Sequence, residues 1–311
     1  MARPPNQENF LRWVTITSAL VLVVAAGVLL TASAAPDRDA AAGRALYAHH
    51  CAACHGEAAK GDGASAAAFA TKPADLTDGR LMNGLPDDFL VTVIIDGGPA
   101  MGLAPTMPPF RGNLNESQAR QIVAFVRTLA RPAYRPEAPA SLVTPAHAPV
   151  QPIFFNHVIH AGSFQIPCQY CHTEARRSVA AGIPSVQRCM GCHTIIGAQD
   201  NPEIRKIHDY WNRRQPIPWV RVFKVPEFTY FPHKSHVRAG LPCQTCHGPI
   251  ERMPRVGADR LGHFIPDDLL NMVRTRPLAR PLTMGWCIDC HRDQNATKGT
   301  SAPLDCVTCH H

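Results

Sequence analysis

The chain has 311 residues, of which 45% are hydrophobic; this composition excludes disorder throughout, and the length suits two modest domains. The formal net charge of +7 would favour an anionic partner such as a nucleic acid only if the basic side chains had no other counterion. Twelve cysteines and sixteen histidines exceed what an ordinary chain of this size carries, and their placement decides what the chain can bind.

Every cysteine belongs to a C-x-x-C-H motif, and none is left over. Two thiols three residues apart can add to the two vinyl groups of one porphyrin, while the adjacent imidazole binds the iron as its proximal ligand. The sequence therefore predicts six covalently attached c-type haems. The motifs consist of Cys51, Cys54 and His55; Cys168, Cys171 and His172; Cys189, Cys192 and His193; Cys243, Cys246 and His247; Cys287, Cys290 and His291; and Cys306, Cys309 and His310.

Two other uses of these cysteines are weaker. Zinc is the main alternative, because the 17 residues between Cys171 and Cys189 suit a ribbon of two C-x-x-C pairs. A zinc ribbon, however, does not need a histidine after every second cysteine. Disulfides within the pairs would join no distant segments. Haem propionates would also act as counterions for the basic side chains, so we expect no nucleic-acid partner.

The N-terminal segment predicts a membrane anchor over residues 13–35. No charged residue lies between Trp13 and Pro36, and the apolar run is long enough to cross a bilayer. Because Arg3 and Arg12 precede it, residues 1–12 are expected in the cytoplasm and the haem-binding part outside. A cleaved signal peptide is the alternative, with Ala32-Ser33-Ala34 as a suitable cleavage site. In either case the haems are extracytoplasmic.

Residues 37–130 are expected to form a first soluble unit. Residues 40–50 are rich in alanine and predict a helix that leads into the first haem motif. Asn115 and Gln118 have the spacing of a capping box at the start of a second helix. An apolar stripe with helical spacing follows, made of Ile122, Phe125, Val126 and Leu129.

Two helices around one haem motif, with Met107-Pro-Pro-Phe110 shortly before the last helix, resemble a class I cytochrome c. The resemblance covers this unit and implies a monohaem domain in which His55 and Met107 are the axial ligands. Alternatives to Met107 stay open, namely Met101, His49 and His50, although the two histidines lie close to the attachment site in sequence.

Residues 131–152 are rich in proline, with Pro132, Pro136, Pro139, Pro145, Pro149 and Pro152. Such a segment is expected to be extended and semi-rigid, and to span up to about 60 Å at about 3.1 Å per residue. It predicts a linker that separates two haem domains, and His147 within it is expected to be a surface residue.

Residues 153–311 carry five motifs, which leaves too little chain per porphyrin for an ordinary apolar core. We therefore expect the haems to form the core, with few long helices or sheets. The pattern Phe-x-His-x-x-His followed by Pro-Cys-Gln-x-Cys-His occurs twice, and it supplies His157, His160, His233 and His236. Two imidazoles at i and i+3 lie on one helical face but cannot easily bind one iron, so each pair should serve two haems.

This repeat resembles small multihaem cytochromes of the c3 and c7 type. The resemblance implies that the first histidine of each repeat binds the haem attached just downstream, which pairs His157 with His172 and His233 with His247. His160 and His236 would then cap two of the irons held by His193, His291 and His310. The fifth distal ligand stays open among Met253, Met284, His208, His263 and His311, or that position is vacant.

The motif order over residues 153–311, with Ile-Pro-Trp-Val-Arg-Val at 217–222 and Met-Gly-Trp before Cys287, resembles the pentahaem cytochrome subunit of alternative complex III. The resemblance implies an electron-transfer subunit without catalytic residues of its own, in a respiratory or photosynthetic complex. Its partners would be iron–sulfur and integral-membrane subunits that oxidise quinol, and a periplasmic carrier or terminal oxidase would accept the electrons. That family usually has a separate monohaem subunit, so this chain resembles a fusion of the two.

The expected fold is therefore mainly α with much irregular structure: one transmembrane helix, a class I cytochrome c domain and a haem-packed, c3/c7-like pentahaem domain. The haem domains are expected on the periplasmic side of a bacterial cytoplasmic membrane. Electrons are expected to enter through the pentahaem domain and leave through the haem of His55, which has the place of a mobile exit module. A multihaem reductase of a small nitrogen oxyanion remains an alternative, since it needs one iron with a vacant distal position.

Overall fold

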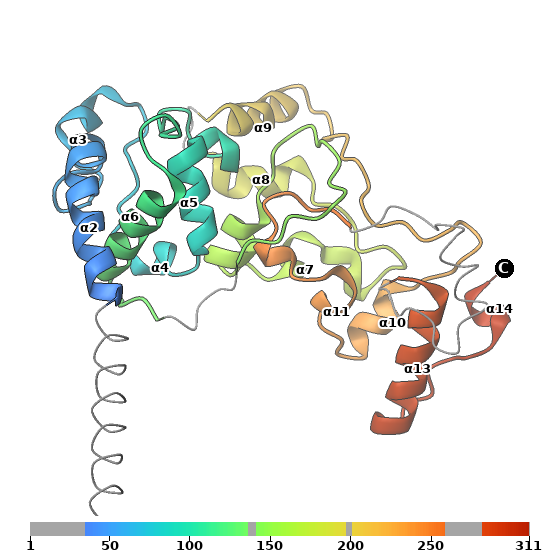
Figure 1. Ribbon diagram of the computed structural model, residues 1–311. Coiled ribbons are helices and arrows are strands. Elements are labelled where there is room, and N and C mark those ends of the chain that lie inside the picture. Colours follow the sequence, from blue (N-terminus) through green and yellow to red (C-terminus); the bar gives the residue numbers. More distant parts are fainter. Residues whose placement is uncertain (1–34, 136–140, 197–200, 259–281, 311) are drawn as a thin grey trace, which may run out of the picture.

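The computed structural model describes residues 35–135, 141–196, 201–258 and 282–310 (Figure 1). This part of the chain is mainly helical, as expected, and its only β pairing consists of isolated bridges, such as that between Asp78 and Arg131. None of its helices is long and apolar enough to cross a membrane. The predicted anchor at residues 13–35 lies outside the described residues, apart from its last residue.

The first unit is built on two helices that pack along each other, α2 (Ala35–His50) and α6 (Glu116–Leu129), beside α5 (Asp87–Asp96) (Figure 1). Gly43 lies where α2 touches α6, and a Cβ there would come within 1.8 Å of the carbonyl oxygen of Gln121. Glycine thus lets the two backbones approach. Shorter elements complete the unit: α3 (Ala52–His55), η1 (Ala64–Ala68), α4 (Gly79–Met82) and η2 (Gly98–Met101).

The predicted capping box at the start of α6 is confirmed. The side chain of Asn115 accepts a hydrogen bond from the backbone N–H of Gln118 at 2.9 Å, and the side chain of Gln118 accepts one from the N–H of Asn115 at 3.0 Å. Two of the helix's otherwise unpaired N–H groups are thereby satisfied. The apolar stripe behind this cap is in the core, where Ile122, Phe125 and Val126 are buried and Leu129 is half-buried.

The second region consists of short helices joined by irregular chain. Its elements are η3 (Val158–Ser163), a π-helical turn, α7 (Cys168–Cys171), η4 (Thr173–Arg176), α8 (Val186–His193), α9 (Pro202–Asn212), α10 (His233–Arg238), α11 (Gln244–His247), η5 (Ile250–Arg252), α13 (Met284–Lys298) and α14 (Cys306–Cys309). Helices α9 and α13, with 11 and 15 residues, are the exceptions to the expected shortness. The buried cluster of this region is small: Ile153, Val186, Met190, Ile207 and Ile217.

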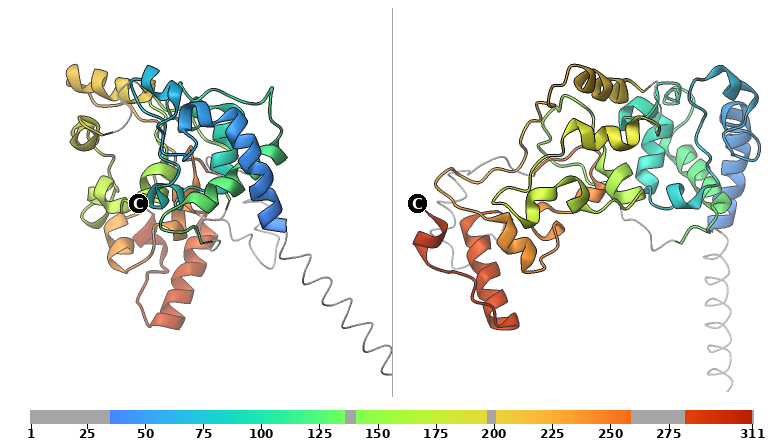
Figure 2. Two further views of the ribbon diagram at one scale, coloured as in Figure 1. Left: turned by 90° about the vertical axis from the view of Figure 1, so that its left-hand side faces the viewer. Right: turned by 180° about the vertical axis from the view of Figure 1, so that it is seen from behind.

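The proline-rich segment does not act as a spacer, contrary to the sequence-based expectation. At its start, the N–H of Arg131 donates to the carbonyl of Thr77 at 2.8 Å, in the first unit. Further along, the N–H of Val143 donates to the carbonyl of Arg252 at 2.9 Å, in the second region. The described parts of the segment therefore hydrogen-bond to both units, and the two units lie directly against each other (Figure 2).

Candidate haem sites

Each C-x-x-C-H motif lies in or beside a helix, from α3 in the first unit to α14 at the C-terminal end. One helical turn places the two cysteines on the same side, with the histidine next to the second. Burial, with a smaller contribution from Cys54, raises the pKa of Cys51 to about 11. Burial likewise raises the pKa of Cys287 to about 11, with Cys246 adding to the effect.

None of the twelve cysteines forms a disulfide. Across the ranges that the structure describes, no group of three or more His, Cys, Asp or Glu side chains converges as direct ligands of a metal ion. The described structure thus offers no tetrahedral site between Cys171 and Cys189 for the zinc alternative.

Most of the candidate axial histidines have the same orientation, in which Nδ1 faces a main-chain carbonyl. Because a carbonyl can only accept, Nδ1 carries the proton and Nε2 keeps its lone pair for a metal. Such a bond also fixes the ring, as ligands to metals generally require. The Nδ1 to carbonyl pairs are His55 with Ala74 at 3.2 Å, His172 with Gly182 at 2.7 Å, His193 with Ile196 at 3.2 Å, His291 with Pro303 at 2.6 Å, His160 with Asn156 at 3.0 Å, His233 with Val179 at 2.8 Å and His236 with Pro232 at 3.0 Å.

Three pairs of imidazole rings lie at a common distance, two pairs stacked and the pair of His160 and His193 edge-on. The ring centres are 6.2 Å apart for His233 and His247, 6.0 Å for His236 and His291, and 6.1 Å for His160 and His193. An imidazole nitrogen binds a transition-metal ion at about 2.0–2.1 Å, and the centre of the imidazole ring lies roughly 1.1 Å from that nitrogen, on the side away from the metal. Two axial imidazoles on one iron therefore have ring centres about 6.2–6.4 Å apart. The spacing of all three pairs fits one haem iron between the rings.

A fourth pair joins His157 and His172. Burial, with smaller contributions from the nearby imidazoles of His172 and His160, lowers the pKa of His157 to about 3. Burial lowers the pKa of His247 to about 4, with His233 and His172 contributing. The rings of His157 and His247 are thus neutral at physiological pH, and the neutral imidazole is the form that binds iron. The structure therefore brings together the histidines that the repeat suggested as partners.

The phenylalanine of the repeat has a role that sequence reasoning did not assign. Phe155 stacks on His160 with ring centres 4.4 Å apart and meets His157 edge-on at 4.8 Å. Phe231 does the same in the second copy, with His236 at 4.4 Å and His233 at 4.9 Å. In each copy, one phenylalanine ring thus contacts two imidazoles, and each imidazole lies near a different proximal histidine. The signal was in the sequence, since the phenylalanine recurs at the same position in both copies.

The spatial order of the motifs was not predictable from the sequence, and neighbouring thiols reveal it. Burial raises the pKa of Cys168, and the Cys243 thiol, which shares a hydrogen bond with it, raises the pKa further. Burial raises the pKa of three further thiols, and a nearby thiol of another motif adds to the rise: Cys171 for Cys189, Cys290 for Cys246, and Cys246 and Cys309 for Cys287. The motifs therefore follow one another in space in the order of their histidines His193, His172, His247, His291 and His310.

In the first unit, the segment before Met107 is held by close backbone contacts. The N–H of Gly98 donates to the carbonyl of Met107 at 2.9 Å, and a Cβ on Gly97, whose φ is +82°, would come within 3.1 Å of that same carbonyl. Met107 is half-buried, whereas Met101 is buried in the core of the unit. His50 packs edge-on against Phe110, with His49 against it. Core packing therefore accounts for Met101, and Met107 stays the predicted ligand.

The candidates for the fifth distal ligand separate into three groups. His208 uses Nε2 in a hydrogen bond with the carbonyl of His193 at 3.0 Å. Met253 is buried beside Gly248, whereas Met284 is 56% exposed. His263 and His311 lie outside the described residues. Within the described ranges, the ring nearest to His310 among the aromatic contacts is Phe228, at 5.7 Å, and the fifth ligand stays a prediction.

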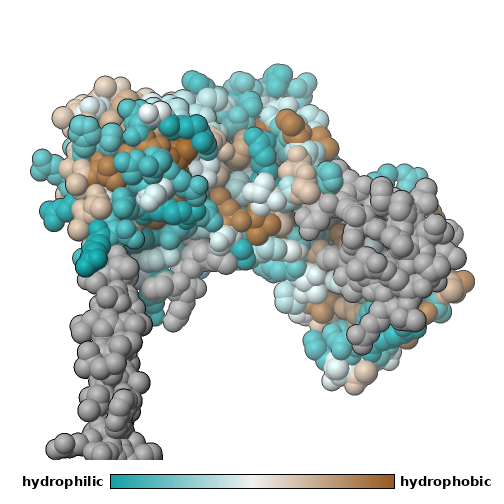
Figure 3. Space-filling model, viewed as in Figure 1, coloured by the Kyte–Doolittle hydropathy of each residue, from teal (hydrophilic) through white to brown (hydrophobic). Residues whose placement is uncertain are grey.

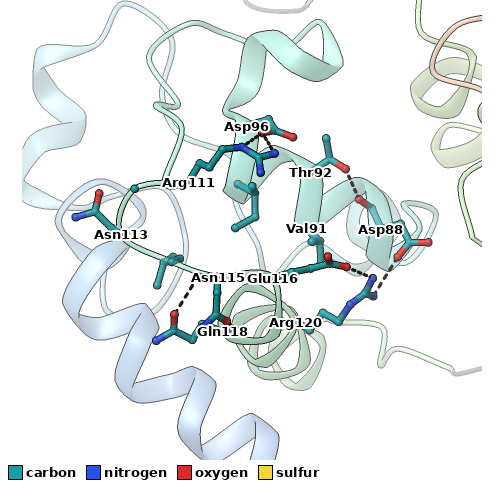
Figure 4. Close-up of a pocket in the computed structure, with 13 residues that line it drawn as sticks. Asp88, Val91, Thr92, Asp96, Arg111, Asn113, Asn115, Glu116, Gln118 and Arg120 are labelled. Carbon is teal, nitrogen blue, oxygen red and sulfur yellow. Dashed lines mark hydrogen bonds and ion pairs between the residues drawn. The ribbon is translucent and has the colours of Figure 1, made fainter.

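A surface depression of about 820 Å³ has no part in these sites (Figure 4). It lies in the first unit between α5 and the start of α6, and no haem-motif residue lines it. Its charged side chains pair with one another, Arg111 with Asp96 and Arg120 with both Asp88 and Glu116. Charges that are already paired across an open depression do not provide a free acid, base or nucleophile for catalysis.

Comparison with known proteins gives two family matches and one relative. Residues 38–126 match the family described as cytochrome c oxidase, cbb3-type, subunit III, and residues 229–311 match cytochrome c7 and related cytochrome c. The chain is also 25% identical over 167 residues to the menaquinone reductase, multiheme cytochrome c subunit, of Nitratidesulfovibrio vulgaris; the match covers 51% of this chain and 76% of the relative.

Among solved structures, a chain of the reducing HAO-like protein complex of Kuenenia stuttgartiensis is similar at 22% identity, with a TM-score of 0.28 over 44% of this chain and 67% of that one. A similarity at that level carries no argument. The family matches and the cysteine pairs show a multihaem c-type cytochrome with a monohaem domain of cbb3 subunit III type towards its N-terminus and a c7-like domain at its C-terminus.

Proposed function

We propose that the chain is a hexahaem electron-transfer subunit of a quinone-linked membrane complex, anchored by residues 13–35 with its haems on the periplasmic side. Residues 37–130 form its monohaem domain and residues 153–311 its pentahaem domain. His55 and Met107 hold the monohaem iron. The pentahaem irons have proximal ligands His172, His193, His247, His291 and His310 and distal ligands His157, His160, His233 and His236, with one distal ligand to be found.

The observation that carries this proposal is the continuous succession of haem motifs through the second region. Each motif has a thiol near a thiol of the next, from Cys189 and Cys171 at one end to Cys287 and Cys309 at the other. The two histidine pairs of the repeat also link successive haems, since His157 and His160 face different proximal ligands. Closely spaced haems in one row suit the passage of electrons, because each step is then short.

The link to a quinone is supported by the multihaem subunit of a menaquinone reductase, to which this chain is 25% identical over 167 residues. The resemblance to alternative complex III adds iron–sulfur and integral-membrane partners and favours oxidation of quinol, with electrons passing to a periplasmic carrier or terminal oxidase. In this proposal the chain has no quinone pocket, and its partners carry out the quinone chemistry.

Two measurements test the proposal. The mass of the denatured chain should exceed that of its polypeptide by six haem units, because thioether bonds survive denaturation; five or fewer would refute the assignment of six sites. In membranes that contain the whole complex, a menaquinol analogue should reduce the haems of this chain. If the haems are instead oxidised by menaquinone and do not respond to the quinol, the direction of flow is that of a quinone reductase.

A further inference from the structure

The monohaem unit is docked onto the second region through three side chains that reach main-chain carbonyls. Asn156 donates from Nδ2 to the carbonyl of Met101 at 3.0 Å, Ser163 donates from its hydroxyl to Leu81 at 2.7 Å, and Asn201 donates from Nδ2 to Gly102 at 2.7 Å. All three side chains belong to buried residues. Bonds of this kind are costly to break when water cannot replace them, so they resist separation of the two units.

The surfaces between these bonds leave no spare room. A Cβ on Gly84 would lie 2.5 Å from the Cα of Ser163, and a Cβ on Gly102 would lie 2.8 Å from the ring of Phe154. Val158, from the second region, belongs to the buried core cluster of the first unit and is fully buried. Helix α4 of the first unit contacts η3 of the second region at this junction. The interface therefore resembles the inside of one domain rather than a transient contact.

Asn156 makes hydrogen bonds to both the first unit and the second region. Its side-chain Nδ2 donates to the carbonyl of Met101. Met101 lies in the segment in which the backbone N–H of Gly98 donates to the carbonyl of Met107. The main-chain carbonyl of Asn156 accepts the Nδ1 proton of His160, whose ring centre lies 6.1 Å from that of His193. Its side-chain oxygen accepts the N–H of Val158 at 2.9 Å, which fixes the turn between these two bonds.

We infer that the monohaem domain is a fixed terminal of the haem row, next to the haem of His193, and that Asn156 is the positioning residue that holds the Met107 segment against the segment of His160. The inference rests on the proposed function in that it takes His160 and Met107 as ligands. The order of the haems by their proximal histidines is then His55, His193, His172, His247, His291 and His310. The monohaem domain exchanges electrons with its neighbour without first moving.

Solvent viscosity separates a fixed terminal from a mobile carrier. In the full-length protein with all haems attached, one haem is photoreduced by a flash, and the rate of transfer between the Met-ligated haem and the other haems is followed by absorbance. A fixed terminal gives the same rate when glycerol raises the viscosity several-fold, because no domain has to diffuse. A rate that falls in proportion to viscosity in the unaltered protein would overturn the inference, whatever the haem count or the quinol response shows.

Asn156→Ser tests the positioning residue. Serine keeps an oxygen for the N–H of Val158 but is too short to reach Met101, so only the bond between the units is lost. The transfer rate should fall about tenfold and become sensitive to viscosity, because the Met107 segment is no longer held against the segment of His160 and has to move into place before transfer. The absorbance spectra and haem count should not change.

Ser163→Ala is the matched control, because Ser163 also donates to the first unit but its hydroxyl touches no haem ligand. This variant should keep a rate that does not depend on viscosity. If Asn156→Ser and Ser163→Ala behave alike, Asn156 has no special place and that part of the inference is wrong. Should Asn156→Ser lose haem, the viscosity measurement on the unaltered protein still decides between fixed and mobile.

Discussion

Residues 35–130 and residues 153–310 are both helical, but the first region has a side-chain core of ordinary size and the second does not. Fifteen residues of the first unit and Val158 form one buried cluster around Phe89 and Ile122, whereas the cluster of the second region has five buried members. Apolar burial is the main force for folding. A region of this length with so small a core needs something else to bury its apolar surface.

The exposed side chains show the same contrast. The large apolar residues that are strongly exposed in the described structure all lie from residue 150 onwards, and Val150, Ile195 and Val307 are 82%, 87% and 78% exposed. Apolar areas are visible between polar ones on the face in Figure 3. Porphyrin faces would cover such side chains, so the contrast indicates that haem replaces side-chain packing as the core of the second region.

The largest expected effect follows from removing one central haem. Cys243→Ala together with Cys246→Ala should cost the second region its protease resistance and much of its other haem content, because Met253 is the only buried large apolar residue described beyond residue 228. Limited proteolysis, with haem counted in each fragment, measures the effect. Cys51→Ala with Cys54→Ala is the control, and it should leave the five C-terminal haems in place. Equal damage from both variants would contradict the contrast between the regions.

Next in size is the redox effect of exchanging the sulfur ligand. A thioether favours ferrous iron more than a second imidazole does. Met107→His should therefore lower the reduction potential of one haem, in the first unit, and leave the other potentials nearly unchanged in a spectroscopic redox titration. Met101→Leu, a change at a buried methionine of the same unit, should move no potential. A shift from Met101→Leu instead of Met107→His would reassign the ligand.

The sequence predicted the local features well but did not predict how the two units are arranged. The haem motifs, the capping box of Asn115 and the histidine repeat are short-range patterns, and the structure displays each of them. The docking of the two units depends on Asn156, Ser163 and Asn201, whose partners are main-chain carbonyls 55, 82 and 99 residues away. A sequence does not show which main-chain carbonyl will accept a hydrogen bond. The proline content of residues 131–152 therefore predicted a spacer, whereas the described parts of this segment hydrogen-bond to both units.

Within the first unit, Arg127 should matter more than any surface charge. Its buried guanidinium donates to the carbonyls of Met82 and Leu85 and to the carboxylate of Asp87 at 2.7 Å. Arg127→Met should lower the free energy of unfolding by about 2–4 kcal/mol, because two buried carbonyls lose their donor. Arg120→Met, which breaks an exposed ion pair, should cost less than about 1 kcal/mol. Denaturant unfolding that ranks Arg120 above Arg127 would contradict this.

The smallest effects on stability are expected from removing a helix cap, and each region offers one cap for comparison. Asn115→Ala removes the cap of α6 and should cost about 1 kcal/mol, which lowers the melting temperature of the first unit by a few degrees. Asp305 caps α14 through the N–H of Thr308 at 2.9 Å, and the hydroxyl and N–H of Thr308 lower the pKa of its carboxyl. Its stabilising effect is therefore present above the usual carboxyl pKa and is lost as the pH falls through the lowered value.

Asp305→Ala should lower the melting temperature at neutral pH less than Asn115→Ala does, because α14 consists of the four residues Cys306–Cys309 and two thioether bonds to the haem would hold most of that turn without a cap. Helix α6 has no such attachment and depends on its cap and its packing against α2. Differential scanning calorimetry of the two variants compares these cases directly. If the loss of Asp305 destabilises the protein as much as the loss of Asn115, the haem does not hold the second region locally, and side-chain contacts stabilise α14 as they stabilise α6.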